Sequence, residues 1–251
     1  MKLINWNCKN DYYKRICFDE NKENLITKEN NDADLFIIEE CTYADCIRLQ
    51  EKYKYVTWFG DGKDSILGIG TFSQKYELTL SPEFTIDCKF RYIIPYYFYE
   101  NSERINIFLV WAKTALYCQS NNYKKIYDKQ YKFEYVDNVY ESMKFYEDLL
   151  KDNVIIIGDF NSGITKDNEN KKHDFLVDFL KSNNIRNCSI DYNMEKSPTF
   201  FQVDKYGNKK YYTDDYCFAS NNIEVEYFNI GNKEIYGEYS DHFPIIIVLN
   251  I

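Results

Sequence analysis

The chain has 251 residues, of which 45% are hydrophobic, and only nine Gly and four Pro, so it is neither collagen-like nor disordered and can bury a sizeable core. It carries 40 acidic and 31 basic side chains and a formal net charge of -9. Non-specific binding of nucleic acid depends on many Lys and Arg side chains that neutralise phosphates, so this balance argues against a broad basic surface that binds nucleic acid. A phosphate ligand would have to be held locally, by a few basic groups or a metal ion.

The cellular location is indicated by what the sequence lacks. The eight cysteines form no C-x-x-C pair and no cluster that resembles a zinc site, so we expect buried thiols. The first residues turn polar before any apolar signal segment develops, which argues against export. The longest apolar run, residues 243–249, is far below the roughly 20 residues of a membrane-spanning helix. We expect a cytoplasmic monomer without a membrane span, with residues 1–251 as one domain.

Short apolar runs rich in Ile, Val, Phe and Trp predict buried strands, because their lengths suit strands better than helices. They are residues 2–6, 35–38, 66–72, 105–111, 154–157 and 243–249. Five strand-like stretches follow one another without a helix between them and predict a meander, with a Gly-rich turn at 60–64. These are residues 55–59, 66–72, 77–80, 91–99 and 104–111.

Helices and one hairpin complete the predicted elements. Apolar residues at three- and four-residue spacing predict one helix within residues 132–150 and another around residues 175–180. Residues 204–208 read as the tip of a hairpin between strands at 199–203 and 210–218. Strands mixed with strand-helix-strand units predict an α/β fold of two packed sheets with helices outside them.

The most informative segment is the strand at 154–157 followed by Gly158-Asp159-Phe160-Asn161. Ligand sites in α/β folds favour the carboxyl ends of strands, where Asp159 and Asn161 emerge. Both residue types also bond their own backbone in turns, so a purely structural role is the alternative.

A second carboxylate pair, Glu39-Glu40, follows the strand at 35–38, and neighbouring residues of an extended chain face opposite ways. Glu40 would suit a hard cation such as Mg²⁺, although a solvated residue at the start of the next helix is the simpler interpretation. Of the two histidines, His242 lies beside Asp241 before the last strand and can donate to a phosphate or shuttle a proton. We interpret His173 as a surface residue.

Two weaker elements sit at strand ends in the same way. Asp214-Asp215 opens a strand-like run with one acid facing each way, and Asn7 ends the first strand. An Asn at a strand end most often bonds a turn.

Taken together, these residues resemble the endonuclease/exonuclease/phosphatase family, which shares the deoxyribonuclease I-like fold. The matching stretches occur in the family's order over nearly the whole chain. They are Ile4-Asn5-Trp6-Asn7, residues 34–42, residues 68–73, Gly158-Asp159-Phe160-Asn161, Pro198-Thr199-Phe200, Asp215-Tyr216 and residues 240–244.

The resemblance implies a four-layer α/β sandwich, two packed mixed sheets flanked by helices, that hydrolyses a phosphoester between the sheets. It implies Mg²⁺, or Mn²⁺ as a substitute, bound by Glu40 with Asn7 beside it and Asp241 nearby. Asp159 would orient or deprotonate the attacking water and Asn161 would hold it or a phosphate oxygen. His242 would bond the scissile phosphate, and Asp215 would fix its imidazole. In-line attack needs such a set of groups.

One position departs from the family. Near Trp111 its members place a His (deoxyribonuclease I-like) or a Tyr (exonuclease III-like). Indole only donates a hydrogen bond, so Trp111 cannot act as a general acid. Protonation of the leaving group then falls to Lys113 or metal-bound water, with Asn7, Trp111 and Lys113 as substrate-binding residues, and the subfamily stays open.

The leading hypothesis is a nuclease or related phosphodiesterase that cleaves DNA or RNA. Tyr and Lys residues within 113–132 would stack bases and contact a backbone, or else form a solvated loop. They include Tyr117, Tyr123, Lys124, Lys125 and Tyr127. The first alternative is a phosphatase or lipid phosphodiesterase for a small phosphorylated molecule, of the inositol phosphate or sphingomyelin type, which the acidic charge fits equally well. The second is a binding module without turnover.

Overall fold

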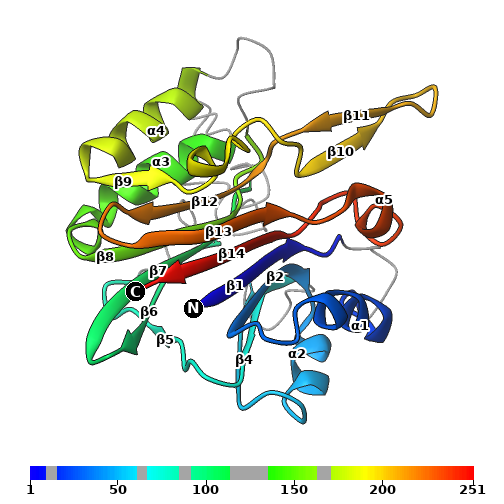
Figure 1. Ribbon diagram of the computed structural model, residues 1–251, viewed down its shortest axis with the longest axis horizontal. Coiled ribbons are helices and arrows are strands. Elements are labelled where there is room, and N and C mark those ends of the chain that lie inside the picture. The colour runs from blue at the N-terminus through cyan, green and yellow to red at the C-terminus, as the bar shows by residue number, and fades with distance from the viewer. Residues whose placement is uncertain (10–15, 61–66, 85–91, 114–134, 163–170) are drawn as a thin grey trace, which may run out of the picture.

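The computed structural model of the chain describes residues 1–9, 16–60, 67–84, 92–113, 135–162 and 171–251. Two six-stranded mixed sheets lie at the centre (Figure 1). The first sheet contains β1 (Lys2–Asn7), β2 (Leu35–Cys41), β3 (Tyr55–Gly60), β4 (Gly68–Ser73), β13 (Glu224–Ile230) and β14 (Ile245–Asn250). Its order is β13-β14-β1-β2-β4-β3, with β1 and β2 parallel.

The second sheet has the order β5-β6-β7-β8-β12-β9, with β7 and β8 parallel and β12 antiparallel to β8. Its strands are β5 (Thr79–Leu80), β6 (Ile93–Glu100), β7 (Glu103–Trp111), β8 (Asn153–Asp159), β9 (Ile185–Asn187) and β12 (Asp215–Ser220). A hairpin of β10 (Phe200–Val203) and β11 (Lys209–Tyr212) forms a separate two-stranded sheet and projects from the body (Figure 1).

Helices cover the outer faces of the sheets (Figure 1). Those on the side of the first sheet are α1 (Glu20–Glu29), α2 (Tyr43–Leu49) and α5 (Lys233–Tyr236). Those on the side of the second are α3 (Tyr135–Phe145) and α4 (Lys171–Ser182). Two short 3-10 helices, η2 (Glu147–Leu150) and η3 (Ile190–Tyr192), complete the described elements.

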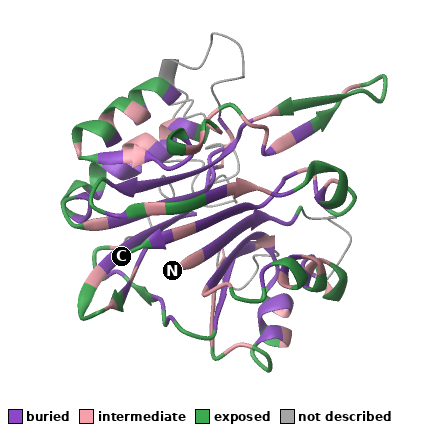
Figure 2. Ribbon diagram, in the orientation of Figure 1, coloured by how far each residue is buried: buried purple, intermediate pink, exposed green. Residues whose placement is uncertain are grey.

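Three apolar clusters separate four layers, because alternate residues of each central strand face opposite ways. Leu3 of β1 lies in the cluster between the sheets, whereas Ile4 lies in the cluster under α1 and α2. Ile155 and Ile156 of β8 are divided in the same way between the inter-sheet cluster and the cluster under α3 and α4. Figure 2 shows the central strands of both sheets as buried. The predicted four-layer α/β sandwich is confirmed.

The predicted meander is wrong as one unit. β3 and β4 pair with each other in the first sheet, whereas β5, β6 and β7 pair in the second. The chain therefore passes from one sheet to the other after β4. Local alternation of apolar residues carries no information on which sheet a strand joins, which explains the error. Of the predicted turn at 60–64, residues 61–64 lie outside the described residues.

Two other predicted elements are divided. The predicted strand at 210–218 consists of β11 and β12, with a break at Thr213 and Asp214. The predicted helix within 132–150 consists of α3 and η2, and its first three residues lie outside the described part.

Buried thiols were expected and are found. The six described cysteines, Cys8, Cys17, Cys41, Cys46, Cys188 and Cys217, are buried thiols outside any disulfide, while Cys88 and Cys118 lie outside the described residues. Within the described residues, every helix is too short or too polar to cross a membrane.

Candidate active site

Three strands of the second sheet bring polar and aromatic side chains into one row. Trp111 ends β7, Asp159 ends β8 and Asp215 begins β12, and the three are register partners. Partners of this kind project on the same face of a sheet. From the first sheet, the Asn7 Nδ2 at the end of β1 donates a hydrogen bond to the Asp159 Oδ2 at 3.0 Å. The row therefore faces the first sheet, and Asp159 and Asn7 join the two sheets.

The turn after β8 fixes Asp159. Gly158 has a φ of 146°, and a Cβ at this position would lie 1.8 Å from the Val110 carbonyl oxygen, so β7 and β8 approach too closely for a side chain. Asn161, at a left-handed φ of 50°, donates from its backbone N to Asp159 Oδ1 at 2.8 Å and from Nδ2 to Oδ2 at 2.9 Å. The same Nδ2 donates to the Ala112 carbonyl at 3.0 Å. Asn161 thus orients the carboxylate and ties it to the end of β7.

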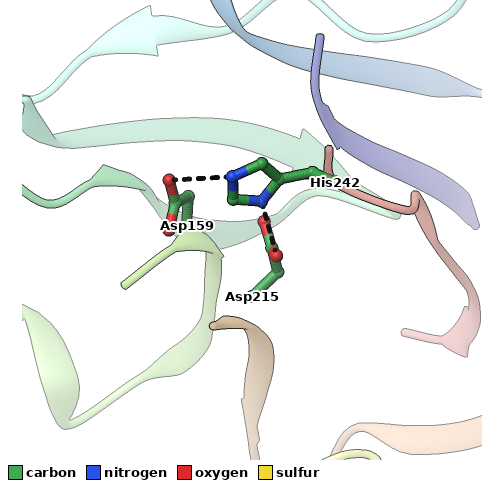
Figure 3. A group of neighbouring side chains, drawn as sticks. All are labelled: Asp159, Asp215 and His242. Atoms are coloured by element: carbon green, nitrogen blue, oxygen red, sulfur yellow. Dashed lines mark hydrogen bonds and ion pairs between the residues drawn. The ribbon is translucent and has the colours of Figure 1, made fainter. Parts of the chain in front are cut away.

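His242 lies between two carboxylates (Figure 3). Its Nδ1 is 2.9 Å from Asp215 Oδ2, and its Nε2 is 4.0 Å from Asp159 Oδ2. The three residues are at most 6% exposed. The Trp6 indole donates to the His242 carbonyl at 2.9 Å, and the His242 backbone N donates to Ser240 Oγ at 3.1 Å. The imidazole is therefore held from both its ring and its backbone.

Burial and mutual charge determine the ionisation of this group. Burial raises the pKa of Asp159 to about 6, against the lowering effect of His242, and burial also raises the pKa of Asp215. Burial alone would lower the pKa of His242, but the carboxylates of Asp215 and Asp159 outweigh it and raise that pKa well above its usual value. These charges favour the protonated imidazole, whose Nδ1 faces Asp215 and whose Nε2 faces Asp159.

Glu40 lies in a β-bulge at the end of β2. The pairing of β2 with β4 shifts between Glu39 and Cys41, and Glu40 has a left-handed φ of 58°. Its Oε1 is 3.4 Å from Asn7 Nδ2, and its side chain is partly exposed. The bulge therefore directs the Glu40 carboxylate toward Asn7, whose side chain also bonds Asp159.

The bulge also changes the expected alternation of Glu39 and Glu40. Glu39 is the register partner of Asn7 and is fully buried, with both carboxylate oxygens lacking a hydrogen-bond partner within the described residues. Burial, followed by the charges of Asp215 and Asp159, raises its pKa well above the usual value. Alternation along an extended chain predicted that only one of Glu39 and Glu40 faces the site. Because of the bulge, both carboxylates lie toward it.

Asp241, unlike its buried neighbour His242, is partly exposed and contacts a lysine. Its carboxylate, 23% exposed, forms an ion pair with Lys9 at 2.9 Å. The Lys9 backbone N donates to Asn7 Oδ1 at 3.1 Å, so Lys9 joins Asp241 to Asn7.

Trp111 and Lys113 lie at the end of β7. The Lys113 Nζ stands 3.2 Å from the centre of the Trp111 ring, a cation-π contact. Burial lowers the pKa of Lys113 to about 8, while the nearby Glu40 and Asp159 raise it. The side chain thus places positive charge beside the carboxylates. The other predicted substrate contacts, in residues 114–132, lie outside the described residues.

The structure corrects the interpretation of His173. It is 1% exposed, its Nδ1 is 3.4 Å from Ser162 Oγ, and its ring lies 4.8 Å from that of Tyr216. Burial lowers its pKa to about 4, so it is neutral. A short run of charged neighbours, Lys171, Lys172 and Asp174, had suggested the surface, but the first turn of an amphipathic helix mixes charged residues with buried ones.

Sequence reasoning missed two residues at the site. Lys9 lies two residues after Asn7, and its ion-pair partner Asp241 is distant in sequence, so no local pattern marks it as a site residue. Thr199, which lies in one of the stretches that resemble the family, accepts hydrogen bonds with its Oγ1 from the backbone N of Asp214 and of Asp215, both at 2.9 Å. It thereby fixes the start of β12.

The donor atoms fit a hard divalent cation. Asp159, Asp215 and His242 offer atoms within 4.8 Å of one another, but these residues are buried and His242 and Asp215 already bind each other. Mg²⁺ keeps several of its waters, so it requires ligands that solvent can reach. Glu40, which is partly exposed and contacts Asn7, meets this condition better. Asp241 is also partly exposed, but its carboxylate already pairs with Lys9, which in turn bonds Asn7.

Comparison with known proteins establishes the fold. No family model matches the sequence, and no curated protein matches it. Solved structures that it resembles are endonuclease/exonuclease/phosphatase proteins, which confirms the resemblance stated above. The 3' phosphatase NExo from Neisseria, bound to a product DNA hairpin, has a TM-score of 0.65 at 14% identity, over 100% of both chains.

Two further structures agree. TDP2 from D. rerio, complexed with a single-strand DNA product, has a TM-score of 0.63 at 12% identity, over 100% of this chain and 99% of that one. An endonuclease/exonuclease/phosphatase family protein from Leptotrichia buccalis has a TM-score of 0.59 at 15% identity, over 100% of both chains. At such identities the likeness concerns the fold, and any activity has to be argued from the site.

Proposed function

We propose that the protein is a divalent-cation-dependent phosphoester hydrolase of the endonuclease/exonuclease/phosphatase type, and that it cleaves DNA or RNA as a nuclease or phosphodiesterase. The observation that carries this proposal is the position of Asp159, buried between the sheets and bonded to Asn7 and Asn161, with the His242 Nε2 4.0 Å away. A carboxylate held beside a charged imidazole can activate water next to a bound phosphate. The solved neighbours NExo and TDP2, with DNA products bound, support the same reaction class.

Asp159 acts as the general base in this proposal. Its pKa of about 6 leaves it ionised at neutral pH and basic enough to accept a proton from water. Asn161 restricts the carboxylate to one orientation through two hydrogen bonds. Its side chain also borders the position of the attacking water.

His242 stabilises charge on the phosphoryl group. Its Nδ1 bonds Asp215, so the proton on Nε2 is directed away from Asp215 and toward the substrate. A donor fixed in this way stabilises the oxygens that gain charge in the transition state. Asp215 is a positioning residue, because it acts through the imidazole.

Glu40 would hold the cation, with Asn7 beside it and Asp241 nearby. When bound, Mg²⁺ (or Mn²⁺) neutralises charge on the phosphoryl oxygens as a Lewis acid. Trp111 borders the site with its indole, and the Lys113 ammonium donates a hydrogen bond to the leaving oxygen. The cation-π contact between them sets the direction of the ammonium.

A small phosphorylated substrate is the second candidate. The net charge of -9 disfavours a long polyanion unless its contacts are local, whereas a small ligand needs only the few cations of the site. We also propose that the protein acts as a cytoplasmic monomer.

A substrate panel tests the proposal. Single-stranded DNA, duplex DNA with an abasic site, RNA, inositol phosphates and sphingomyelin are incubated with Mg²⁺ and with Mn²⁺, with His242→Ala as the control. Cleavage of an oligonucleotide that is lost in the control supports the nuclease. Release from the small substrates alone selects the second candidate. No turnover of any substrate, with Mg²⁺ bound in calorimetry, would contradict hydrolysis and favour a binding module.

A further inference from the structure

Lys9 is held at the site by two separate contacts. Its Nζ pairs with Asp241 Oδ2 at 2.9 Å, and its backbone N donates to Asn7 Oδ1 at 3.1 Å. Its left-handed φ of 52° turns the chain two residues after the end of β1, so that both contacts are possible. Asn7 and Asp241 are two of the residues placed around the cation above. The ammonium therefore stands among the proposed cation ligands.

A second lysine anchors this turn. The Lys22 Nζ of α1 donates to the carbonyl oxygens of Cys8, of Cys17 at 2.8 Å and of Lys9 at 3.3 Å. Three carbonyls on one ammonium fix the backbone on either side of Lys9. The Lys9 side chain, 53% exposed, keeps access to solvent and hence to a substrate. The position of its charge is thus set by the fold.

The charge of Lys9 changes what Asp241 can bind. A carboxylate that already bears an ammonium offers little attraction to a second cation, and the ammonium repels a divalent ion at the same oxygen. Glu40 is linked to Asn7 on its other side, through Nδ2 rather than Oδ1. The site therefore has two parts. A divalent cation can bind at Glu40, whereas the negative charge of Asp241 is already neutralised by the Lys9 ammonium.

We propose that the Lys9 ammonium takes the place of a second divalent cation, so that the site binds one divalent cation, at Glu40, and presents Lys9 to the substrate phosphate beside Asp241. This inference rests on the proposed function, because it concerns the cation of that reaction. An ammonium has three donors, of which the Asp241 pair occupies one, and the others can meet phosphate oxygens.

Counting bound Mn²⁺ on the full chain without substrate tests the inference. Mn²⁺ is titrated into the wild type and Lys9→Met, with the free ion measured by electron paramagnetic resonance and the heat by calorimetry. We expect one ion in the wild type, lost in Glu40→Gln. We expect two in Lys9→Met, with the second ion lost in the double variant Lys9→Met/Asp241→Asn. Lys9→Arg, which keeps the charge, should bind one.

Lys75→Met is the matched control. Lys75 pairs with Glu100 at 3.2 Å, with side-chain exposures of 50% and 24% that resemble the 53% and 23% of Lys9 and Asp241. It should bind one ion, and thermal melting verifies that every variant is folded. Two ions in the wild type, or an equal number in wild type and Lys9→Met, would overturn the role of Lys9 and leave the proposed function standing. No ion in any variant would overturn both.

Discussion

Asp159 is the residue on which most contacts of the site converge. It accepts hydrogen bonds from Asn7 and twice from Asn161, and it faces the Nε2 of His242. These donors stabilise the ionised form, whereas burial favours the neutral form and raises the pKa to about 6. The carboxylate is consequently both oriented and basic, which are the two properties that a general base needs.

Lys113 gives the first prediction at this scale. Lys113→Met removes the donor to the leaving oxygen, so kcat should fall about 10²-fold with a smaller change in KM, as for the loss of one transition-state donor. Lys113→Arg should retain part of the activity. Steady-state kinetics on the cleaved substrate measures both. Lys144→Met, which removes another lysine above an aromatic ring (Tyr140, 5.1 Å), is the control, and an equal loss there would refute the assignment.

His173 gives a prediction on pH. Burial lowers its pKa from 6.5 to about 4 in the folded state, so the unfolded chain binds a proton first as the pH falls. Its contribution to stability is therefore present above pH 6.5 and is lost as the pH falls toward 4, by up to about 3 kcal/mol. Urea unfolding at pH 7 and pH 4.5 should show a smaller loss in His173→Gln than in the wild type. Equal losses would contradict the burial of a neutral imidazole.

At the scale of elements, Thr199 joins three parts of the chain. Its backbone N donates to the Tyr212 carbonyl of the hairpin, and its carbonyl accepts from the Phe243 N that follows His242. Its Oγ1 accepts from the backbone N of Asp214 and of Asp215, the first residue of β12. The base of the hairpin, the start of β12 and the His242 loop are thus fixed by one residue that is 1% exposed.

Thr199→Val should therefore lower both stability and activity. Two buried N–H groups lose their acceptor, which we expect to cost about 2 kcal/mol or more in the free energy of unfolding. Displacement of Asp215 should lower kcat as well. Urea unfolding and kinetics measure the two effects, with Thr199→Ser, which keeps the hydroxyl, as the control. Wild-type values in Thr199→Val would show that these hydrogen bonds do not position the site.

Elements were predictable where their apolar pattern was strong. Central strands such as β8 and β14 carry runs of Ile and Val, and the two helices over the second sheet carry apolar stripes. α1 was missed because its buried residues are only Glu23 and Ile26, and Glu23 is stabilised by ion pairs with Arg48 and Lys52 rather than by apolar contacts. β13 was missed because it is an edge strand with mostly exposed or half-buried residues.

The candidate site was predictable for a related reason. Asn7 and Asp159 end strong strands and Asp215 begins one. Because β12 runs antiparallel to β8, the start of β12 lies beside the end of β8. Lys9 and Thr199 could not be assigned, because their partners, Asp241 and the start of β12, are distant in sequence. The burial of His173 depends on Tyr216, which is equally distant.

At the scale of the whole molecule, the acidic charge limits how a substrate binds. The lysines that we place at the substrate are Lys9 and Lys113, so only a few phosphates should be neutralised. For an oligonucleotide, a plot of the logarithm of the binding constant against that of the salt concentration should have a slope of about -1 to -2. Fluorescence anisotropy between low and physiological salt measures it. A slope of about -5 or steeper would indicate a broad basic surface instead.

The four-layer arrangement explains why the site lies where it does. The two sheets supply different groups, with Asn7 and Glu40 from the first and Asp159 and Asp215 from the second, so folding itself assembles the site. That residues 1–251 form one domain stays a prediction, as do the roles of the individual side chains.

The central claim is that Asp159 activates water for attack on a phosphoester. The most direct measurement is the single-turnover cleavage rate of the preferred substrate with Mg²⁺ in the wild type and in Asp159→Asn, which keeps the shape of the side chain. We expect the rate to fall about 10³-fold, with no loss of folded structure in circular dichroism. A rate within about tenfold of the wild type would contradict the claim, because general-base catalysis contributes more than that.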